Sequence, residues 1–432
     1  MQSEKVFQGN EIQSALPWQD PAARFALKGV SATGQPMQWP LGMDQLSKHL
    51  LLLGGIGTGK TNAFYHLIRQ LRAQMTARDV MIIFDTKGDY HARFYRPGDV
   101  VISNDRRATG RASADYWNVF QEISVDDRVV ENALEISKTI FARQIENTHQ
   151  PFFPNAAKDL LTALLLHLVR SDHLKGMQNN QGLREMLDSF SVEAMLRILG
   201  AHPDLRALKS YIADPTSGQT LGVVAELQQA AREILVGNFA RQGRLSMRRI
   251  VREKGGVVVF VEYDLGIGHM LTPIYQLLFD LAIKEALCRS ADEGNVYFII
   301  DEFRLLPHLA HVDDGVNFGR GLGAKFIAGV QNVEQVYDAY GENRARSILS
   351  GFGTLISFRP NDPSSREYVK QMLGRNTRVF TFESAVRTRG VVEQLSDAYV
   401  AEDWDLTRLR LGEAIVSYAE HPPFRFRFDA YR

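Results

Sequence analysis

Short apolar runs and longer segments with helical spacing alternate along most of this chain. The runs lack polar alternation, which is typical of strands buried on both faces of a parallel sheet. They occupy residues 49–53, 79–85, 98–103, 255–264, 295–303, 324–331, 353–358 and 413–419. Helical patterns connect them, so the sequence predicts an α/β fold with a largely parallel central sheet flanked by helices.

Two regions depart from this alternation. Residues 1–46 contain two short strand patterns, FALKGV and PMQWPL, separated by the turn residues SATGQ, which predicts a two-stranded flap. Residues 121–250 show helical periodicity throughout, for example in VVENALEISKTIFARQI, which predicts an all-α inserted domain. The core domain is therefore expected in two parts, residues 47–120 and 251–432.

A glycine-rich stretch lies between the first core strand and a helical segment. GGIGTGKT follows HLLLL and fits the pattern G-x-x-x-x-G-K-[ST], which wraps backbone N–H groups around a polyphosphate at a helix N-terminus. Lys60 is expected to neutralise the β- and γ-phosphates, and Thr61 to help hold Mg²⁺. The core is thus predicted to be a RecA-like P-loop NTPase, although the motif alone also occurs in kinases, GTPases and transporter ATPases. The expected nucleotide-binding residues are Gly54, Gly55, Ile56, Gly57, Thr58, Gly59, Lys60, Thr61 and Asn62.

Polar residues follow the later core strands. The run VYFII ends in Asp301 and Glu302, which is a Walker B pattern at the sheet edge where open α/β sheets place ligands. Asp301 is expected to hold Mg²⁺ through water, and Glu302 to polarise the attacking water as general base. The next strand ends in Gln331, a candidate γ-phosphate sensor. The glycine-flanked Arg320 precedes that strand and is a candidate arginine finger, but an ordinary strand-end amide and a solvated loop arginine are the alternatives.

Composition narrows the class of protein. The chain has 432 residues and 45% apolar content, enough for two domains or one domain with a large insertion. Its 50 basic and 50 acidic residues give a formal net charge of zero, so the chain lacks the excess of basic residues typical of a protein that coats nucleic acid. A zero net charge still permits a locally basic pore. We see no signal peptide and no apolar run of about 18 residues, so a cytoplasmic protein is expected. Magnesium is the only metal expected.

Two further features are given structural interpretations. The single cysteine, Cys288, lies in a helical pattern and is expected to be a buried thiol. The basic stretch RQGRLSMRRIVREKGG is interpreted as a solvated helix face rather than a DNA contact. Its arginines are Arg241, Arg244, Arg248, Arg249 and Arg252.

These motifs together resemble the type IV secretion coupling proteins of the TraD/TrwB kind, within the HerA/FtsK superfamily of ring-forming DNA-translocating ATPases. The resemblance spans residues 25–430. It is carried, in this order, by HLLLLGGIGTGKT, MIIFDTKGDYHARFY, GGVVVFVEYDLGIGHM, FIIDEFRLLPHL, NFGRGLGAKFIAGVQ and GTLISFRPNDPSSREYVKQMLG.

The resemblance implies an ATP-hydrolysing hexameric ring with DNA, bound without sequence preference, in a central channel. It implies that Gln331 is the sensor and that Arg320 acts across a subunit interface. Because the connection to Arg320 joins two nucleotide-proximal strands, we expect Arg320 to leave the sheet between two nucleotide-proximal edges. The segment Asp85–Asp89 matches the family's D-x-x-G-[DE] signature, without an assignable chemical step.

Members of this family usually carry N-terminal transmembrane helices, and this chain begins shortly before its P-loop. A soluble member that docks on a membrane-anchored secretion partner, a truncated form, and a protein of a cytosolic pathway are all consistent with this difference. The expected partners are therefore DNA, further copies of the chain, and a relaxosome or membrane protein, at a cytoplasmic or peripheral inner-membrane location.

Two other functions stay open. A HerA-like cytosolic motor in DNA repair or phage defence would share the catalytic residues and act with a nuclease. A non-enzymatic scaffold that binds ATP would be expected to lack the Walker B glutamate or the finger arginine, and both residue types are present in this chain.

Overall fold

The chain forms two compact units. A computed structural model describes residues 3–20, 23, 25–104, 115–146, 148–383, 391–418 and 420–431. The first unit comprises Met1–Ile83, Arg289–His308 and Val312–Arg432, and the second comprises Phe84–Cys288 and Leu309–His311. Each unit therefore collects segments that are distant in sequence.

The first unit is built on a sheet with parallel central strands. Strands β10 (Thr354–Ser357), β4 (Leu50–Leu53), β9 (Ala324–Val330) and β8 (Val296–Ile300) pair in this order, followed by β5 (Val80–Asp85). Every residue of these strands is buried, as expected for strands covered on both faces. The predicted α/β class with a largely parallel sheet is confirmed.

Helices of the first unit connect these strands. Glycine or a side-chain cap precedes several of them, such as Asp362, which accepts a hydrogen bond from Ser365 N before a proline in the first turn. The α-helices are α1 (Met43–Ser47), α2 (Lys60–Gln74), α12 (Val312–Phe318), α13 (Val333–Tyr340), α14 (Glu342–Ser350), α15 (Pro363–Leu373) and α16 (Asp403–Thr407). Short 3₁₀ turns are η5 (Ala291–Glu293), η6 (Phe303–Leu305) and η7 (Gly319–Leu322).

Antiparallel strands extend the sheet beyond β10. They are β13 (Glu413–Tyr418), β14 (His421–Phe428), β2 (Phe25–Val30) and β3 (Pro36–Leu41), in this order. The two strands predicted near the N-terminus are present and pair with each other. They continue the main sheet and do not form a separate flap, because β2 pairs with β14 and Trp39 of β3 is buried against Phe424 and Phe426.

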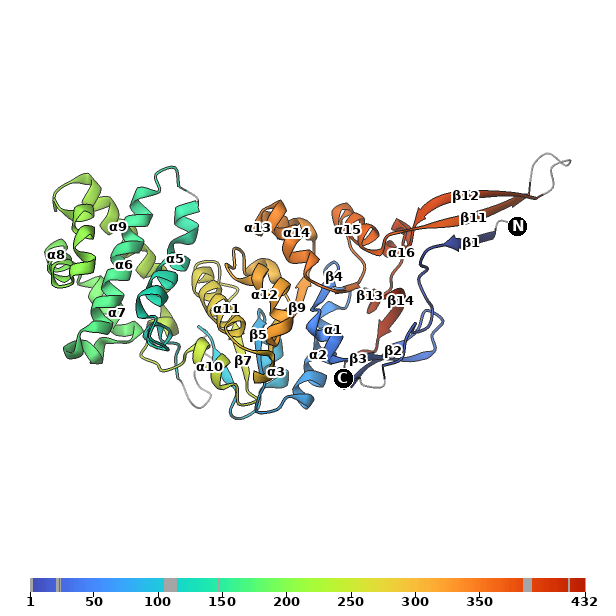
Figure 1. Ribbon diagram of the computed structural model, residues 1–432, viewed down its shortest axis with the longest axis horizontal. Coiled ribbons are helices and arrows are strands. Elements are labelled where there is room, and N and C mark those ends of the chain that lie inside the picture. Colours follow the sequence, from blue (N-terminus) through green and yellow to red (C-terminus); the bar gives the residue numbers. More distant parts are fainter. Residues whose placement is uncertain are drawn as a thin grey trace. The chain divides into compact units, whose positions relative to one another are not determined.

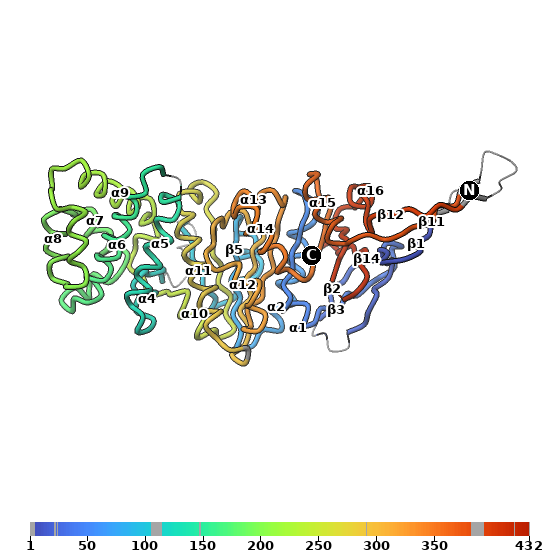
Figure 2. The backbone as a smooth tube through the Cα atoms, turned by 45° about the horizontal axis from the view of Figure 1, so that its top comes forward, coloured from blue at the N-terminus to red at the C-terminus, as the bar shows by residue number. Residues whose placement is uncertain are grey.

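A second, three-stranded sheet belongs to the same unit. Strands β11 (Arg375–Glu383) and β12 (Val391–Tyr399) form a long hairpin, and β1 (Ser3–Gln8) pairs antiparallel with β11 (Figure 2). Phe7 and Leu395 are exposed on it. This ribbon was not predicted from the sequence, because its strands carry polar residues on both faces.

The second unit combines a parallel strand pair with many helices. Strand β6 (Val100–Ile102) pairs with β7 (Val258–Glu262), and α3 (Asp89–Phe94) precedes β6. Helices α5 to α9 form a bundle (Figure 1). The remaining α-helices are α4 (Val119–Ile123), α5 (Val129–Glu146), α6 (Phe152–Arg170), α7 (Asn180–Asp188), α8 (Val192–Ala201), α9 (Gly218–Ile234), α10 (Met247–Glu253) and α11 (Thr272–Leu287). The 3₁₀ turns are η2 (Asp172–Met177), η3 (Pro203–Ile212) and η4 (Gly237–Ala240).

Helix α6 is the core of this bundle and packs against α5 and α9. Its length and its mean hydropathy of 1.2 over an 18-residue window would suit a membrane span, yet 61% of that window is buried within the structure. A buried core helix passes the same test, so this helix is weak support for a membrane span.

Two observations differ from expectation. The second unit is wider than the predicted insertion of residues 121–250, because α11 packs against α5 and α10. The expectation that Cys288 is buried is wrong: the residue follows the last turn of α11 as its C-cap and is exposed.

Candidate active site

Three strand ends bring the predicted site residues to one edge of the first unit's sheet. Leu53 of β4 is in register with Val330 of β9, and Ile300 of β8 is in register with Ala328. Because these strands are parallel, the residues that follow them emerge at the same edge. These are the P-loop after β4, Asp301 and Glu302 after β8, and Gln331 after β9.

The P-loop needs glycine at specific positions. Gly59 has φ of +113°, in the left-handed region, and a Cβ there would lie 2.8 Å from the Cα of Gly412. A Cβ on Gly55 would lie 2.2 Å from the side chain of Asn361. Ile56 is exposed at the tip of the loop. Asn361 and Gly412 were not predicted as neighbours of the P-loop, although Asn361 follows a predicted core strand, which indicates the same edge of the sheet.

Lys60 and Thr61 begin helix α2 beside the carboxylate of Asp301. The Lys60 ammonium is buried and donates to the carbonyl oxygens of Gly54 and Gly55, at 2.5 and 3.1 Å. Thr61 Oγ1 donates to Asp301 Oδ2 at 3.1 Å. A hydroxyl and a carboxylate are the hard oxygen ligands that Mg²⁺ takes, next to a helix N-terminus suited to phosphate. The residues present therefore fit a nucleotide with Mg²⁺.

Glu302 is held by two side chains. Arg304 Nε donates to Glu302 Oε1 at 3.0 Å, and the Gln331 amide donates to Glu302 Oε2. Burial raises the pKa of Glu302, and the contacts with Arg304 and Gln331 oppose that rise. A carboxylate that is oriented and partly desolvated suits a general base. Arg304 was not singled out from the sequence, where it lies two residues after Glu302.

Arg320 is not brought to this edge. It lies in η7, which leads into the amino-terminal end of β9, whereas Gln331 follows the carboxyl end of the same strand. Seven strand residues separate the two ends, roughly 20 Å at the usual rise per residue. The expectation that Arg320 leaves the sheet between nucleotide-proximal edges is wrong, because a connection between parallel strands crosses to the opposite edge before re-entering the sheet. Its guanidinium instead contacts Asp44 at 3.1 Å.

Asn62 is directed toward the C-terminal segment. Its side-chain amide donates to Asp429 O at 2.9 Å, and its side-chain oxygen accepts from Tyr431 N at 2.7 Å. His66, one turn later on α2, also contacts Asp429 O. The nucleotide contact of Asn62 stays a prediction, and its side chain is committed to the chain segment after β14.

The signature segment Asp85–Asp89 lies in the second unit. Asp85 is buried and accepts hydrogen bonds from His91 N at 2.8 Å and Lys87 N at 3.4 Å. Gly88 takes a φ of +74° before α3. His91 Nδ1 is 2.6 Å from Glu262 Oε1. Asp85 thus fixes the turn between β5 and α3, which gives the signature a structural role.

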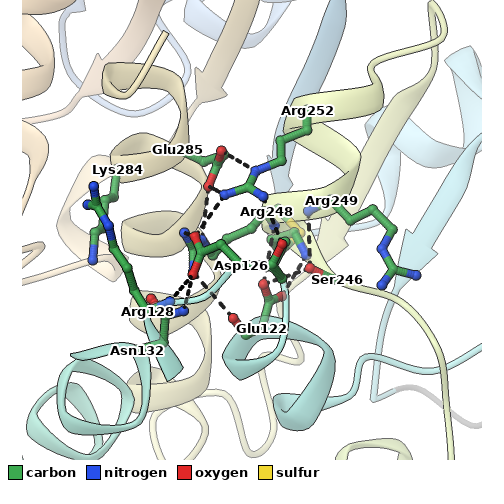
Figure 3. A network of polar contacts seen from close by, with 12 residues as sticks. Glu122, Asp126, Arg128, Asn132, Ser246, Arg248, Arg249, Arg252, Lys284 and Glu285 are labelled. Atoms are coloured by element: carbon green, nitrogen blue, oxygen red, sulfur yellow. Dashed lines mark hydrogen bonds and ion pairs between the residues drawn. The ribbon is translucent and has the colours of Figure 1, made fainter. Parts of the chain in front are cut away.

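The basic stretch before β7 is mostly paired (Figure 3). Arg248 is buried, and its guanidinium contacts Glu285 at 2.9 Å and Asp126 at 2.7 Å. Arg252 contacts the same two carboxylates. The interpretation as a solvated face is wrong for Arg248, because its partners come from distant segments. Arg244 pairs with Asp115, Arg249 with Gln121, and Arg241 lies over the ring of Tyr116.

Glu122 is the buried centre of the same network. Its carboxylate accepts from the Trp117 indole, the Ser246 hydroxyl and the backbone N–H groups of Met247 and Arg248. It thereby caps α10 and joins the segment before α4 to the segment before α10, which are the two ends of the helical region. The contacts among these five residues form a structural anchor, so this part of the basic stretch is not a free basic surface.

Comparison with known proteins places this geometry in a family. The family model described as the type IV secretion-system coupling protein DNA-binding domain matches residues 36–387. Coupling protein TraD of Escherichia coli K12 is 21% identical over 341 residues, which cover 78% of this chain and 45% of TraD. The chain thus spans about half the length of the curated relatives it matches.

Solved structures share the fold. The unbound bacterial conjugative coupling protein TrwBdeltaN70 superposes with a TM-score of 0.77 at 20% identity, covering 99% of this chain and 94% of that one. TrwB bound to the non-hydrolysable ATP analogue ADPNP gives 0.75 at 20% identity, covering 99% and 95%. TrwB bound to ADP and Mg²⁺ gives 0.73 at 20% identity, covering 96% and 90%.

Proposed function

Because this chain belongs to the type IV secretion-system coupling protein family, we propose that it is an ATPase that moves DNA or nucleoprotein through a ring of its own copies. The observation that carries the proposal is the convergence of Lys60, Thr61, Asp301, Glu302 and Gln331 at one sheet edge. The complexes of TrwB with ADPNP and with ADP and Mg²⁺ support nucleotide binding by this chain.

Each residue has a distinct part in the proposed reaction. Lys60, which now contacts the P-loop carbonyl groups, would pair with the β- and γ-phosphates, and Thr61 and Asp301 would hold Mg²⁺. When bound, Mg²⁺ neutralises charge on the phosphates. Glu302 accepts a proton from the attacking water at a carboxylate oxygen, and Gln331 keeps that carboxylate oriented. A scaffold without turnover would not need this oriented base.

The opposite edge of the sheet completes the proposed site in a neighbouring copy. Arg320 lies too far from its own P-loop edge to reach a nucleotide bound there, roughly 20 Å along β9. Half of its side chain is exposed, so a neighbouring copy has access to it. We therefore infer a head-to-tail hexameric ring in which Arg320 stabilises charge on the phosphate of the next subunit.

The substrate and partners follow from the family. Its matching domain is described as DNA-binding, which supports DNA as the translocated polymer and favours a coupling role over a nuclease-linked repair motor. The proposed partners are a relaxosome and a membrane-anchored secretion protein. The proposed location is the cytoplasm or the cytoplasmic side of the inner membrane through that partner.

Replacement of Glu302 tests the proposal. Glu302→Gln should still bind ATP, because the Lys60 and Asp301 contacts remain, but its turnover should fall by about 10²–10⁴-fold, as expected when a general base is lost. ATP hydrolysis with and without a single-stranded oligonucleotide, and binding of a fluorescent ATP analogue, measure both effects. DNA should raise the rate of the unmodified protein.

The matched control is Glu334→Gln, an exposed glutamate on α13, which should leave the rate unchanged. Undiminished hydrolysis by Glu302→Gln would show that another group is the base. A rate that no form of DNA alters would contradict the motor and leave an ATPase of another kind.

A further inference from the structure

Asp44 lies beside Arg320 and is itself fixed by two other side chains. It occupies the first turn of α1, which leads into the amino-terminal end of β4. Its Oδ2 atom is 2.8 Å from Lys48 Nζ and accepts a hydrogen bond from the Tyr418 hydroxyl. Lys48 also donates to the Tyr418 hydroxyl at 2.6 Å and to Glu420 at 2.8 Å. Asp44 is therefore held by Lys48, the residue after α1, and by Tyr418 of β13.

The two oxygens of Asp44 have different roles. Oδ2 faces Lys48 and Tyr418, whereas Oδ1 accepts from Arg320 Nη2 at 3.1 Å. The hydrogen bonds from Lys48 and Tyr418 lower the pKa of Asp44, which keeps the carboxylate charged. The contact uses one guanidinium nitrogen, so the remaining N–H groups of Arg320 are not committed to Asp44.

The glycine-rich backbone around Arg320 does little to fix the direction of its side chain. Gly319 and Gly321 flank the residue, and Gly323 follows with φ of +82°. The side chains of Arg320 and Asp44 are 56% and 55% exposed, so this ion pair contributes little to folding stability. Its geometry is better suited to fixing the direction of a side chain than to holding the fold together.

We propose that Asp44 is a positioning residue, which holds Arg320 in the orientation that reaches the nucleotide of the neighbouring subunit. The proposal rests on the trans-acting Arg320 of the proposed function. Lys48 and Tyr418 keep Asp44 in place, and Asp44 directs one side of the guanidinium while the other side stays available to a phosphate. No contact of Asp44 with the nucleotide is required.

Mixed rings test the proposal. Arg320→Ala and Glu302→Gln subunits should each be nearly inactive, and their mixture should regain partial ATPase activity where an intact Glu302 site meets an intact Arg320. Adding Asp44→Ala to the Glu302→Gln subunit removes Asp44 from the chain that supplies Arg320. The restored kcat should then fall about fivefold, the rate equivalent of about 1 kcal/mol, with KM for ATP unchanged.

The reverse arrangement is the internal control. Adding Asp44→Ala to the Arg320→Ala subunit removes Asp44 from a chain without the finger, and the restored kcat should not change. Asp44→Asn, which keeps the shape of the side chain, should give a smaller fall in the first arrangement only. Glu342→Ala breaks a similarly exposed pair with Arg346, 2.7 Å long, and should have no effect in either arrangement.

Each outcome decides between the proposals. Equal losses in both arrangements would show that Asp44 acts on subunit structure, and no loss in either would show that Arg320 does not depend on it. Both results overturn the positioning role while leaving the trans finger intact. Absence of activity in the starting mixture, with subunit exchange verified, would overturn the trans finger and with it the role of Asp44.

Discussion

Glu302 is subject to opposing influences that set the pH at which it can accept a proton. Burial raises its pKa, Asp301 adds to that rise, and the N–H groups of Arg304 and Gln331 oppose it by stabilising the charged form. A general base must be ionised, so the acid limb of the pH–rate profile is expected above the pH at which an ordinary glutamate titrates.

Replacement of Gln331 should move that limb in a defined direction. Gln331→Leu removes a donor to the carboxylate, which raises the pKa of Glu302 further, so half-maximal kcat on the acid side should occur at higher pH than in the unmodified protein. A series of ATPase rates against pH measures the shift. Gln371→Leu, at an exposed position of α15, should leave the profile in place, and a shift to lower pH in Gln331→Leu would contradict the interpretation.

The P-loop and the Walker B pair could be predicted because their chemistry is encoded in adjacent residues. Lys60 and Thr61 follow glycines within one loop, and Asp301 and Glu302 follow one buried strand. The surroundings of Arg320 could not be predicted, because Asp44 is 276 positions away in the sequence. The same limit hid the burial of Arg248, whose partners lie on segments that only the fold brings together.

The anchor around Glu122 shows how separate helices depend on one buried carboxylate. It receives donors from before α4 and from the first turn of α10, and Arg248 links it to Glu285 of α11 (Figure 3). Removing this carboxylate leaves the buried Trp117 indole, the Ser246 hydroxyl and the N–H groups of α10 without their acceptor, which is costly. The attachment of the helical bundle to α10 and α11 should therefore depend on this residue.

Glu122→Ala should destabilise the second unit by at least about 1–3 kcal/mol, the usual cost of leaving a buried hydrogen-bond donor unsatisfied. Thermal unfolding should show a lower transition, and hydrogen exchange should show lost protection of the amides of Met247 and Arg248. Asp204→Ala breaks the exposed pair with Arg170 and should change stability by less than about 1 kcal/mol. Retained protection of both amides in Glu122→Ala would mean that α10 does not need this cap.

Buried strands were predictable and exposed ones were not. The apolar runs of β4, β8, β9 and β10 are buried throughout, and each was recognised from its composition. The ribbon of β1, β11 and β12 has polar residues on both faces, so it lacks the alternation that marks a half-buried strand. Its first strand also pairs with residues 369 to 378 positions later, a contact without a local signal.

The 432 residues of this chain carry no net formal charge, yet the family to which it belongs is described by a DNA-binding domain. Affinity for DNA must then come from local groups of basic residues, several of which are already paired with carboxylates. Single-stranded DNA binding should therefore weaken steeply as salt rises, with a slope of about −0.7 per neutralised phosphate in a double-logarithmic plot.

Fluorescence anisotropy with a labelled oligonucleotide across a range of salt concentrations measures this slope. A scrambled oligonucleotide of the same length should give the same curve, because contacts to phosphate carry no sequence information. Binding that is insensitive to salt, or that depends strongly on base order, would be inconsistent with a motor that tracks the backbone.

Strand β9 carries Gln331 after one end and Arg320 before the other. A two-fold dimer buries the same patch of both copies, so it cannot satisfy two sites that lie on opposite sides of one sheet. An assembly built through these two ends is polar. Each copy contributes Arg320 to one neighbour and accepts the Arg320 of the other neighbour, so the series of copies has a direction. A copy whose Arg320 end is blocked would stop the addition of further subunits at that end only. The choice between a closed circle and an open filament then depends only on the rotation between successive copies.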